Sequence, residues 1–343
     1  MSSQTKDGVL VFALIIVGFA SPLLGQQKGQ WVPGQSGLDA GVLPDPGFTY
    51  ASLNVNYSAN ALNDSGGNKL PGITGKLSFW AIESVFYYVP KTKILGGKLA
   101  FMTVLPAANG SLTADVGVRS LGIPPKFGLN GGGYGFADSW FQPFTLGWNL
   151  KRADTFVAYA FTAPTGRYSP GASNNVGSGY WGNNIEGSST VYLTKNRGTT
   201  ANMLADWEVH GQKKVASFPS GQFSHITPGQ AFTLEWGIGQ FLPLDKQMHK
   251  LLEVGLIGYD QWQVSANGGN YLVAGVPVAA SRVPYYSVHA VGFQTNFILP
   301  PKHLSFFFKY EPEYRAKARP QGRTIVFGGS YTYKFRKAPP SKP

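Results

Sequence analysis

The chain has 343 residues, of which only 13% are charged, 14% are aromatic and 44 are glycine. Average soluble domains carry roughly 25% charged residues, so this composition argues against a helical cytosolic enzyme. There is no cysteine, which excludes disulfides, a thiolate nucleophile and a cysteine metal site.

The first residues have the features of an export signal. Lys6 precedes an apolar run at 9–20, and small residues at Gly18, Ala20 and Gly25 offer cleavage points. The run is shorter than the ~20 residues of a spanning helix, so we expect a signal peptide over 1–25, followed by a flexible segment over 26–46. The alternative is a buried helix of a soluble domain.

Alternating apolar and polar residues then recur from 47 to 336, while sustained helical periodicity does not. In the last run, Ile325, Phe327, Tyr331 and Tyr333 share one face with Phe335. The pattern predicts strands over 47–60, 74–89, 94–105, 136–149, 154–166, 179–194, 199–210, 229–243, 250–264, 284–299, 302–314 and 321–336.

Connections between these runs alternate in length. Short ones lie near 90–94, 150–154, 195–198, 244–249 and 300–303, and long ones near 61–73, 106–135, 167–178, 211–228, 265–283 and 315–321. This rhythm is typical of outer-membrane barrels, with short periplasmic turns and long outer loops. We therefore predict an all-β fold, an antiparallel transmembrane β-barrel of about 12 strands over 47–336 with a periplasmic tail at 337–343. A soluble sandwich is the alternative.

A barrel of this size should enclose a narrow pore, because roughly eight strands leave an interior filled by side chains and about 16–18 leave an open channel. The loops at 106–135 and 265–283 are the candidates for folding inward as a partial plug. Glu83 and Asp260 fall on the expected lipid face, which predicts a bulge or a shifted register at those two places.

The polar faces of several strands bring ionisable side chains into the expected lumen. These lumen and solute-path candidates are Glu186, Asp206, Glu208, His210, Glu235, Glu253, Lys309 and Glu311. They could form a structural network that fills a narrow barrel. They could also form a selectivity lining, since rings of carboxylates favour cations.

The net charge of +12 gathers in the short turns and the tail, at Lys91, Lys93, Lys151, Arg152, Lys195, Arg197, Lys246, Lys250, Lys302, Arg336, Lys337 and Lys342. This distribution predicts a solvated rim beside outer-membrane lipid, and no nucleic-acid partner.

Catalytic and cofactor motifs are weak. Ser287 and His289 share a strand face, as in phospholipase barrels, but in reversed order and without an evident Asn or Asp to orient the imidazole. GGGYG at 131–135 does not continue into a GKS or GKT motif, and the other histidines lack metal-ligand spacing. We expect no enzyme activity, no cofactor and no metal.

Several stretches resemble one family of bacterial outer-membrane proteins. They are APTGRYSPG with NNVGSGYW, WEVHG, ITPGQAFTLEWG, LLEVGLIGYDQWQVS and FKYEPEYRAKARPQGRTIVFGGSYTYKF. Over roughly residues 45–336 the chain resembles the "putative MetA-pathway of phenol degradation", or SphA-like, proteins. The resemblance implies a membrane β-barrel associated with aromatic-compound catabolism that admits hydrophobic or aromatic nutrients.

Together these observations predict passive, selective uptake of a small hydrophobic or aromatic solute across the bacterial outer membrane. A closed structural or surface-interaction barrel is the alternative. The barrel-assembly machinery is an expected partner, although Phe335 is followed by RKAPPSKP where many barrels end on an aromatic residue.

Overall fold

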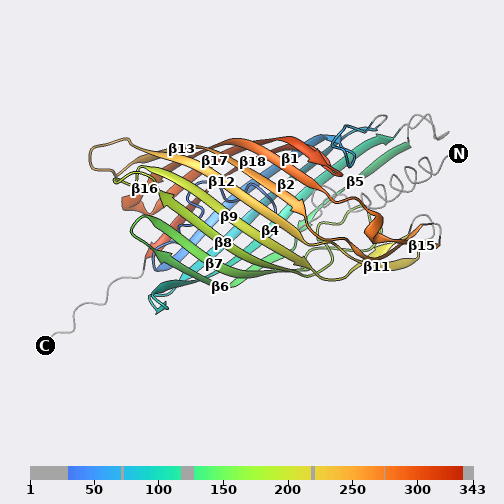
Figure 1. Ribbon diagram of the computed structural model, residues 1–343, viewed down its shortest axis with the longest axis horizontal. Helices are drawn as coiled ribbons and strands as arrows, with labels where there is room; N and C mark the ends of the chain where they lie inside the picture. Colours follow the sequence, from blue (N-terminus) through green and yellow to red (C-terminus); the bar gives the residue numbers. More distant parts are fainter. Residues whose placement is uncertain (1–29, 71–72, 117–126, 218–220, 274, 335–343) are drawn as a thin grey trace.

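The computed structural model is a closed antiparallel β-barrel of twelve strands (Figure 1). The ring closes where β2 pairs with β4, and every neighbouring pair in it is antiparallel. The structure describes residues 30–70, 73–116, 127–217, 221–273 and 275–334. The expected signal peptide and the tail that follows the barrel lie outside these residues.

Apart from β4, which was expected over 94–105 and extends to Val116, the barrel strands agree closely with the ranges expected from alternation. They are β1 (Gly47–Leu62), β2 (Ile73–Val89), β4 (Gly97–Val116), β6 (Ser139–Asn149), β7 (Ala153–Ala163), β8 (Gly182–Tyr192), β9 (Thr199–His210), β12 (Ala231–Pro243), β13 (Leu251–Gln263), β16 (Ser287–Leu299), β17 (Leu304–Lys317) and β18 (Pro320–Lys334). The prediction of about twelve strands is confirmed.

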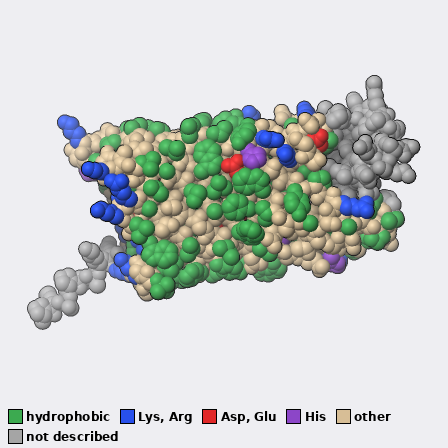
Figure 2. All heavy atoms as spheres, in the orientation of Figure 1, with side chains coloured by type: hydrophobic (Ala, Val, Ile, Leu, Met, Phe, Trp, Pro, Cys, Tyr) green, Lys and Arg blue, Asp and Glu red, His purple; other side chains and the backbone are tan. Residues whose placement is uncertain are grey.

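Side chains alternate between the inside and the outside of the wall, because successive residues of a strand point to opposite faces. On β18, Thr324 and Val326 are buried, whereas Phe327, Tyr331 and Tyr333 are exposed. Apolar side chains cover much of the outer wall in Figure 2, and basic side chains gather at its left end. An apolar outer wall is what a barrel in contact with lipid requires.

The two ends of the barrel differ as the alternating connections predict. Short turns gather at one end, where β3 (Lys93–Ile94) and the 3-10 turn η3 (Pro300–Lys302) lie. At the other end, β10 (Lys213–Ala216), β11 (Phe223–Thr227), β14 (Gly268–Val273) and β15 (Val276–Ala279) form a separate four-stranded sheet, next to the 3-10 turn η2 (Ala280–Arg282). By the usual arrangement, the short-turn end is periplasmic.

The structure corrects the expectation that two long loops fold into the lumen. Most of 106–135 is strand, because β4 extends to Val116 and pairs with β5 (Phe127–Phe136) in a protruding hairpin. Residues 268–273 and 276–279 of the other loop join the small sheet, which Figure 1 places beyond the barrel end. The described parts of both loops are mostly strand, and their backbone groups are paired outside the lumen.

The N-terminal segment occupies the lumen instead. Residues 30–46, expected to be a flexible lead, run inside the ring of strands before β1 begins (blue in Figure 1). Hydrogen bonds join their backbone to side chains of β8, β9, β12, β16 and β17. Within the described ranges, no helix is long and apolar enough to cross a membrane.

Glu83 and Asp260, which were both expected on the lipid face, lie on opposite faces of the barrel wall. Glu83 is buried on the inner wall, and the β1–β2 register runs past it without a bulge. Its strand is apolar on both faces, with Ala81 buried and Ile82 exposed, so alternation assigned the wrong face to Glu83. Asp260 does lie on the outer side, without a bulge in β13, because its neighbours Tyr259 and Gln261 are buried inside.

Candidate solute-binding lumen

The eight ionisable residues expected in the lumen all lie on the inner wall, and none is more than 6% exposed. Glu186 is on β8, the Asp206, Glu208 and His210 side chains are on β9, and the other four come from β12, β13 and β17. Strand alternation alone places them there. The structure adds the molecule's own N-terminal segment as the partner of several of them.

Two carboxylates hold the first part of this segment. Glu208 accepts hydrogen bonds from the backbone N–H of Gln30 at 2.5 Å and of Trp31 at 2.6 Å. Glu235 accepts from the indole N–H of Trp31 at 2.9 Å, and from the backbone N–H of Gly34 at 3.0 Å and of Ser36 at 2.7 Å. Carboxylates are strong acceptors for such donors, so both charges are satisfied without a bound cation.

A lysine holds the carbonyl side of the same turn. The ammonium of Lys309 donates to the carbonyl oxygens of Gln35, at 2.6 Å, and of Ser36. The chain there has left-handed backbone at Gly34 (φ 90°) and Gly37 (φ 100°). A Cβ at Gly37 would collide with the side-chain oxygen of Gln294, so glycine permits both the turn and the close approach.

The remaining acidic residues are held by amides or lie near one another. Asn184 donates to both oxygens of Asp206, at 2.8 and 3.0 Å, and Asn296 donates to Glu253 at 2.6 Å. Burial raises the pKa of Asp39, in the N-terminal segment, to about 6, and its carboxyl lies beside that of Glu253.

His210, Glu311 and Glu186 are the remaining members of the eight-residue set, and their contacts differ from those above. His210 pairs with Glu208, and its other ring nitrogen lies 2.9 Å from the carbonyl oxygen of Gly229. One carboxylate oxygen of Glu311 and one of Glu186 have no hydrogen-bond partner among the described residues. The eight residues therefore form a buried polar network around the segment, and they do not form an open ring.

The opposite half of the inner wall is apolar and leaves a cavity of about 460 Å³ between itself and the segment. Its apolar lining comes from Leu53 on β1, Phe79, Ala81 and Val85 on β2, and Met102 and Val104 on β4. Polar groups come from Glu83, Gln142 and Glu186, and from Gln294, Asn296 and Lys309 of β16 and β17. Trp31 and Leu38 close the cavity from the segment side. This volume falls within the range of small-molecule sites.

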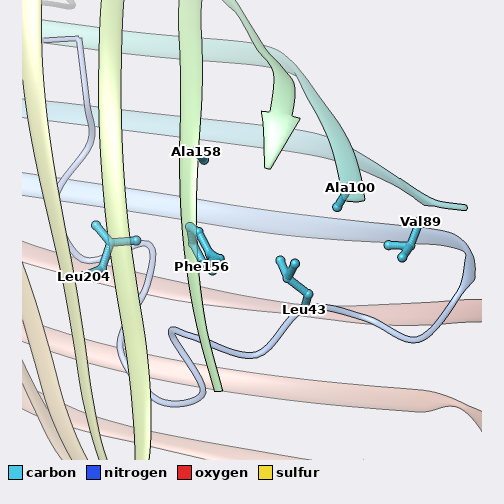
Figure 3. Packing of buried hydrophobic residues seen from close by; sticks show 6 residues of the cluster. All are labelled: Leu43, Val89, Ala100, Phe156, Ala158 and Leu204. Atoms are coloured by element: carbon cyan, nitrogen blue, oxygen red, sulfur yellow. The ribbon is translucent and has the colours of Figure 1, made fainter. Parts of the chain in front are cut away.

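An apolar anchor fixes the far end of the segment. Leu43 is buried against Val89, Ala100, Phe156, Ala158 and Leu204, which come from the four strands β2, β4, β7 and β9 (Figure 3). A Cβ at Gly147 would collide with Leu43, so a glycine on β6 makes room for this side chain. The segment is thus held by polar contacts over 30–41 and by packing at its end.

Sequence reasoning missed several residues that bind the segment. Glu83 accepts from the side-chain amide of Gln35 at 3.0 Å, Gln294 accepts from the N–H of Leu38 at 3.0 Å, and Thr190 accepts from the N–H of Gly41 at 2.9 Å. Gln294 and Thr190 are uncharged, and only their inward strand positions could have indicated them.

The outer wall carries a histidine with an acidic partner. Nδ1 of His289 lies 2.6 Å from Asp260, whose other oxygen accepts from the indole N–H of Trp236 at 3.0 Å. The expectation that no Asp orients this imidazole is therefore wrong. Across the part of the chain that the structure describes, however, no hydrogen bond joins Ser287 to His289, so a nucleophile and base pair is not assembled.

No group of three or more His, Asp or Glu side chains that could hold a metal ion occurs in the described ranges.

Residues 59–327, more than half of the chain, match the family described as "Putative MetA-pathway of phenol degradation". The chain belongs to this family. Among solved structures, the COG4313 outer membrane channel from Pseudomonas putida F1 is similar, with a TM-score of 0.64 at 14% identity over 89% of this chain and 100% of that one. The P. putida toluene transporter TodX gives a TM-score of 0.40 at 10% identity over 92% of this chain and 99% of that one. Among curated proteins, none matches the chain.

Family membership and the closed barrel agree with the apolar outer wall. The protein is an outer-membrane β-barrel with a channel-like lumen, and its lumen is shared between its own N-terminal segment and a mostly apolar cavity.

Proposed function

We propose that this barrel carries out passive, selective uptake of small hydrophobic or aromatic compounds. The observation that supports this most is the cavity of about 460 Å³, lined by apolar side chains of β1, β2 and β4 and placed beside the N-terminal segment. Apolar walls with a few polar groups are typical of sites for small organic molecules. The family's description, which concerns phenol degradation, points to the same solute class.

Of the eight polar residues, Glu186 and Lys309 also line the cavity, and the others act on the solute indirectly in this proposal. By holding the segment on their own side of the lumen, Glu208, Glu235 and Lys309 keep polar backbone away from the apolar wall. They thereby set the width and polarity of the remaining space. Selectivity then comes from an apolar passage on one side, where a sugar would lose its hydrogen bonds to water.

Movement of the solute needs no covalent chemistry or cofactor. The segment is held by hydrogen bonds and packing, each contributing about 0.5–3 kcal/mol, so small shifts of the segment are accessible. The remaining partners that we propose are outer-membrane lipid on the outer wall and the barrel-assembly machinery during biogenesis.

A closed structural barrel is the second candidate, and the dense bonding of the segment favours it. Glu235 alone accepts three hydrogen bonds from the segment, which describes a firm plug. If that plug never shifts, the cavity would be an internal void and no solute would pass.

Flux through the refolded protein in liposomes distinguishes the two candidates. Benzoate and a neutral sugar of similar size should be compared, with empty liposomes as the control for leakage through lipid. We expect benzoate to enter faster with the protein present while the sugar is excluded. Absence of protein-dependent flux for either solute would support the closed barrel.

A further inference from the structure

The connection between β7 and β8 forms a lid over the lumen cavity at the long-loop end of the barrel. Residues 164–180 make up this lid. Val176 and Ser178 line the cavity, and Val176 is buried in one apolar cluster with Ala108 of β4 and Val326 of β18. The lid therefore reaches from its own strands toward other parts of the wall and forms part of the roof of the cavity.

The lid is a compact unit that its own hydrogen bonds hold together. The carbonyl oxygen of Arg167 accepts from the backbone N–H of Val176 at 2.9 Å, and the guanidinium of Arg167 donates to the carbonyl oxygen of Asn174 at 3.0 and 2.7 Å. Asn175 donates to the carbonyl oxygen of Ser169 at 2.8 Å and accepts from the N–H of Ser169 at 2.7 Å. A loop that is closed in this way can change position as one body.

One carboxylate at the rim of the barrel binds both ends of the lid. Asp138, between β5 and β6, accepts from the backbone N–H of Gly166 at 2.9 Å and of Ser178 at 2.6 Å, and also from the hydroxyl of Ser178. A Cβ at Gly177 would lie 2.7 Å from the same carboxylate, so glycine permits this close approach. Hydrogen bonds to a charged acceptor are stronger than neutral ones, so Asp138 acts as a latch.

Neutral contacts join the lid to its other neighbours. The hydroxyl of Tyr168 donates to the carbonyl oxygen of Lys214 on β10 at 2.5 Å, and the N–H of Gly132 on β5 donates to the carbonyl oxygen of Ser173 at 2.9 Å. The barrel ladder does not depend on the lid, because β7 pairs directly with β8. Opening of the lid would therefore leave this part of the wall intact.

The lid is also joined to the N-terminal segment. The side-chain amide of Gln30 donates to the hydroxyl of Ser178 at 2.6 Å and to the carbonyl oxygen of Tyr180 at 2.8 Å. The backbone N–H of Gln30 is in turn bound by Glu208 of β9. The lid and the segment thus share Gln30 as a contact, and both border the same cavity.

We propose that the lid opens at Asp138 and exposes the lumen cavity to the outside, so that it gates the entry of the solute. This inference rests on the proposed uptake function and adds the entry route to it. When Asp138 releases Gly166 and Ser178, Val176 leaves its apolar cluster and the cavity faces the extracellular side. Burial of Val176 favours closure again after the solute has passed. The alternative is a fixed roof, with entry at another place.

A reversible disulfide between the lid and the wall tests the gate. A Cβ at Gly135 on β5 would lie 3.6 Å from Cγ2 of Val176, which is within reach of a disulfide, and the chain has no cysteine of its own. The variant Gly135→Cys with Val176→Cys should carry benzoate into liposomes at least about fivefold more slowly when oxidised than after reduction, because the lid is then locked shut.

The matched control is a disulfide that joins two wall strands and leaves the lid free. The hydroxyls of Thr49 on β1 and Thr332 on β18 lie 2.8 Å apart, on directly paired residues. Thr49→Cys with Thr332→Cys should carry benzoate equally fast when oxidised and when reduced. Equal benzoate flux through the oxidised and reduced lid variant, with its disulfide verified by mass spectrometry, would overturn the gate, and so would an equal loss in the control.

A second measurement follows the lid without solute flux. Val176 is 2% exposed, so a single Val176→Cys thiol should react with a soluble maleimide when the lid opens. Asp138→Asn should speed this labelling about tenfold, because the lid loses a charged acceptor. The matched control is Asp64→Asn, since Asp64 accepts from the backbone N–H of Gly66 at 2.9 Å and of Asn68 at 2.8 Å in the β1–β2 loop. This control should leave the labelling rate unchanged.

The two measurements separate movement of the lid from transport. Unchanged labelling in an Asp138→Asn variant that keeps its heat-dependent gel mobility would overturn opening at Asp138, and so would equally faster labelling in Asp64→Asn. If no form of the protein carries benzoate while Asp138→Asn alone is labelled faster, transport is refuted and the opening of the lid is supported.

Discussion

The two halves of the inner wall use the same strand geometry for opposite purposes. On β8, β9, β12 and β17 the inward positions carry carboxylates and a lysine, and these bind the backbone of the N-terminal segment. On β1, β2 and β4 the inward positions are mainly Leu, Phe, Ala, Val and Met, and a cavity remains there. Buried charges need partners, so the polar half attracts the segment and the apolar half is left available for a solute.

Removal of the segment should change the lumen most. With residues 30–45 deleted, the polar half would be exposed to water, and the barrel would enclose a wide aqueous pore. We expect sugar flux into liposomes to rise on the order of tenfold or more, with loss of the preference for aromatic solutes. A deleted barrel that is folded, as judged by its heat-dependent gel mobility, and yet conducts no sugar would show that the segment does not limit the lumen.

Weakening the polar clamp should release the segment without removing it. The double variant Glu208→Gln with Glu235→Gln replaces charged acceptors, each worth about 1.5–3 kcal/mol per hydrogen bond, by neutral ones. Because the chain has no cysteine, a single Ser36→Cys substitution gives a unique thiol in the segment. Its labelling by a soluble maleimide should become about tenfold faster in the double variant.

The matched control for this clamp is Glu186→Gln. Glu186 is buried on the same half, but no hydrogen bond joins it to the segment within the described residues. Labelling of the Ser36→Cys thiol should stay near the wild-type rate in this control. Faster labelling there as well would mean that any lost lumen charge loosens the barrel.

A smaller, pH-dependent effect should come from Asp39. Burial raises the pKa of this carboxyl from its ordinary value of 3.8 to about 6 when the segment is docked. Docking is therefore most favourable below about pH 4 and is weakened as pH rises through 6, because burial disfavours the ionised carboxyl. Labelling of the Ser36→Cys thiol, corrected for thiolate reactivity, should increase severalfold from pH 4 to pH 7, and Asp39→Asn should flatten the profile. A flat profile with Asp39 intact would contradict the assignment.

The sequence predicts the barrel well because each strand carries its own signal. Alternation located β9 and the inward faces of Glu208, Glu235 and Lys309, since those strands are polar inside and apolar outside. It failed on β2, where both faces are apolar and Glu83 was assigned outward. A period of two contains no information about which apolar face meets lipid.

The lumen contents could not be predicted in this way. Residues 30–46 show no periodicity, and what the wall recognises there is mostly backbone N–H and carbonyl groups, which every sequence possesses. Only the glycines at 34 and 37, which have positive φ angles, mark the turn, and glycine in a leader segment fits a flexible linker equally well. Tertiary pairing with distant strands decided the outcome.

The central claim is that the solute occupies the apolar half of the lumen. A comparison of two neighbouring substitutions tests it most directly. Ala81 lies in the cavity wall and is 1% exposed, whereas the next residue, Ile82, is 48% exposed on the outer wall. Ala81→Phe should fill the cavity and reduce protein-dependent benzoate flux by at least about fivefold, while Ile82→Phe, which adds bulk only toward lipid, should leave it unchanged. Equal benzoate flux through the wild-type protein and a folded Ala81→Phe variant would contradict the claim.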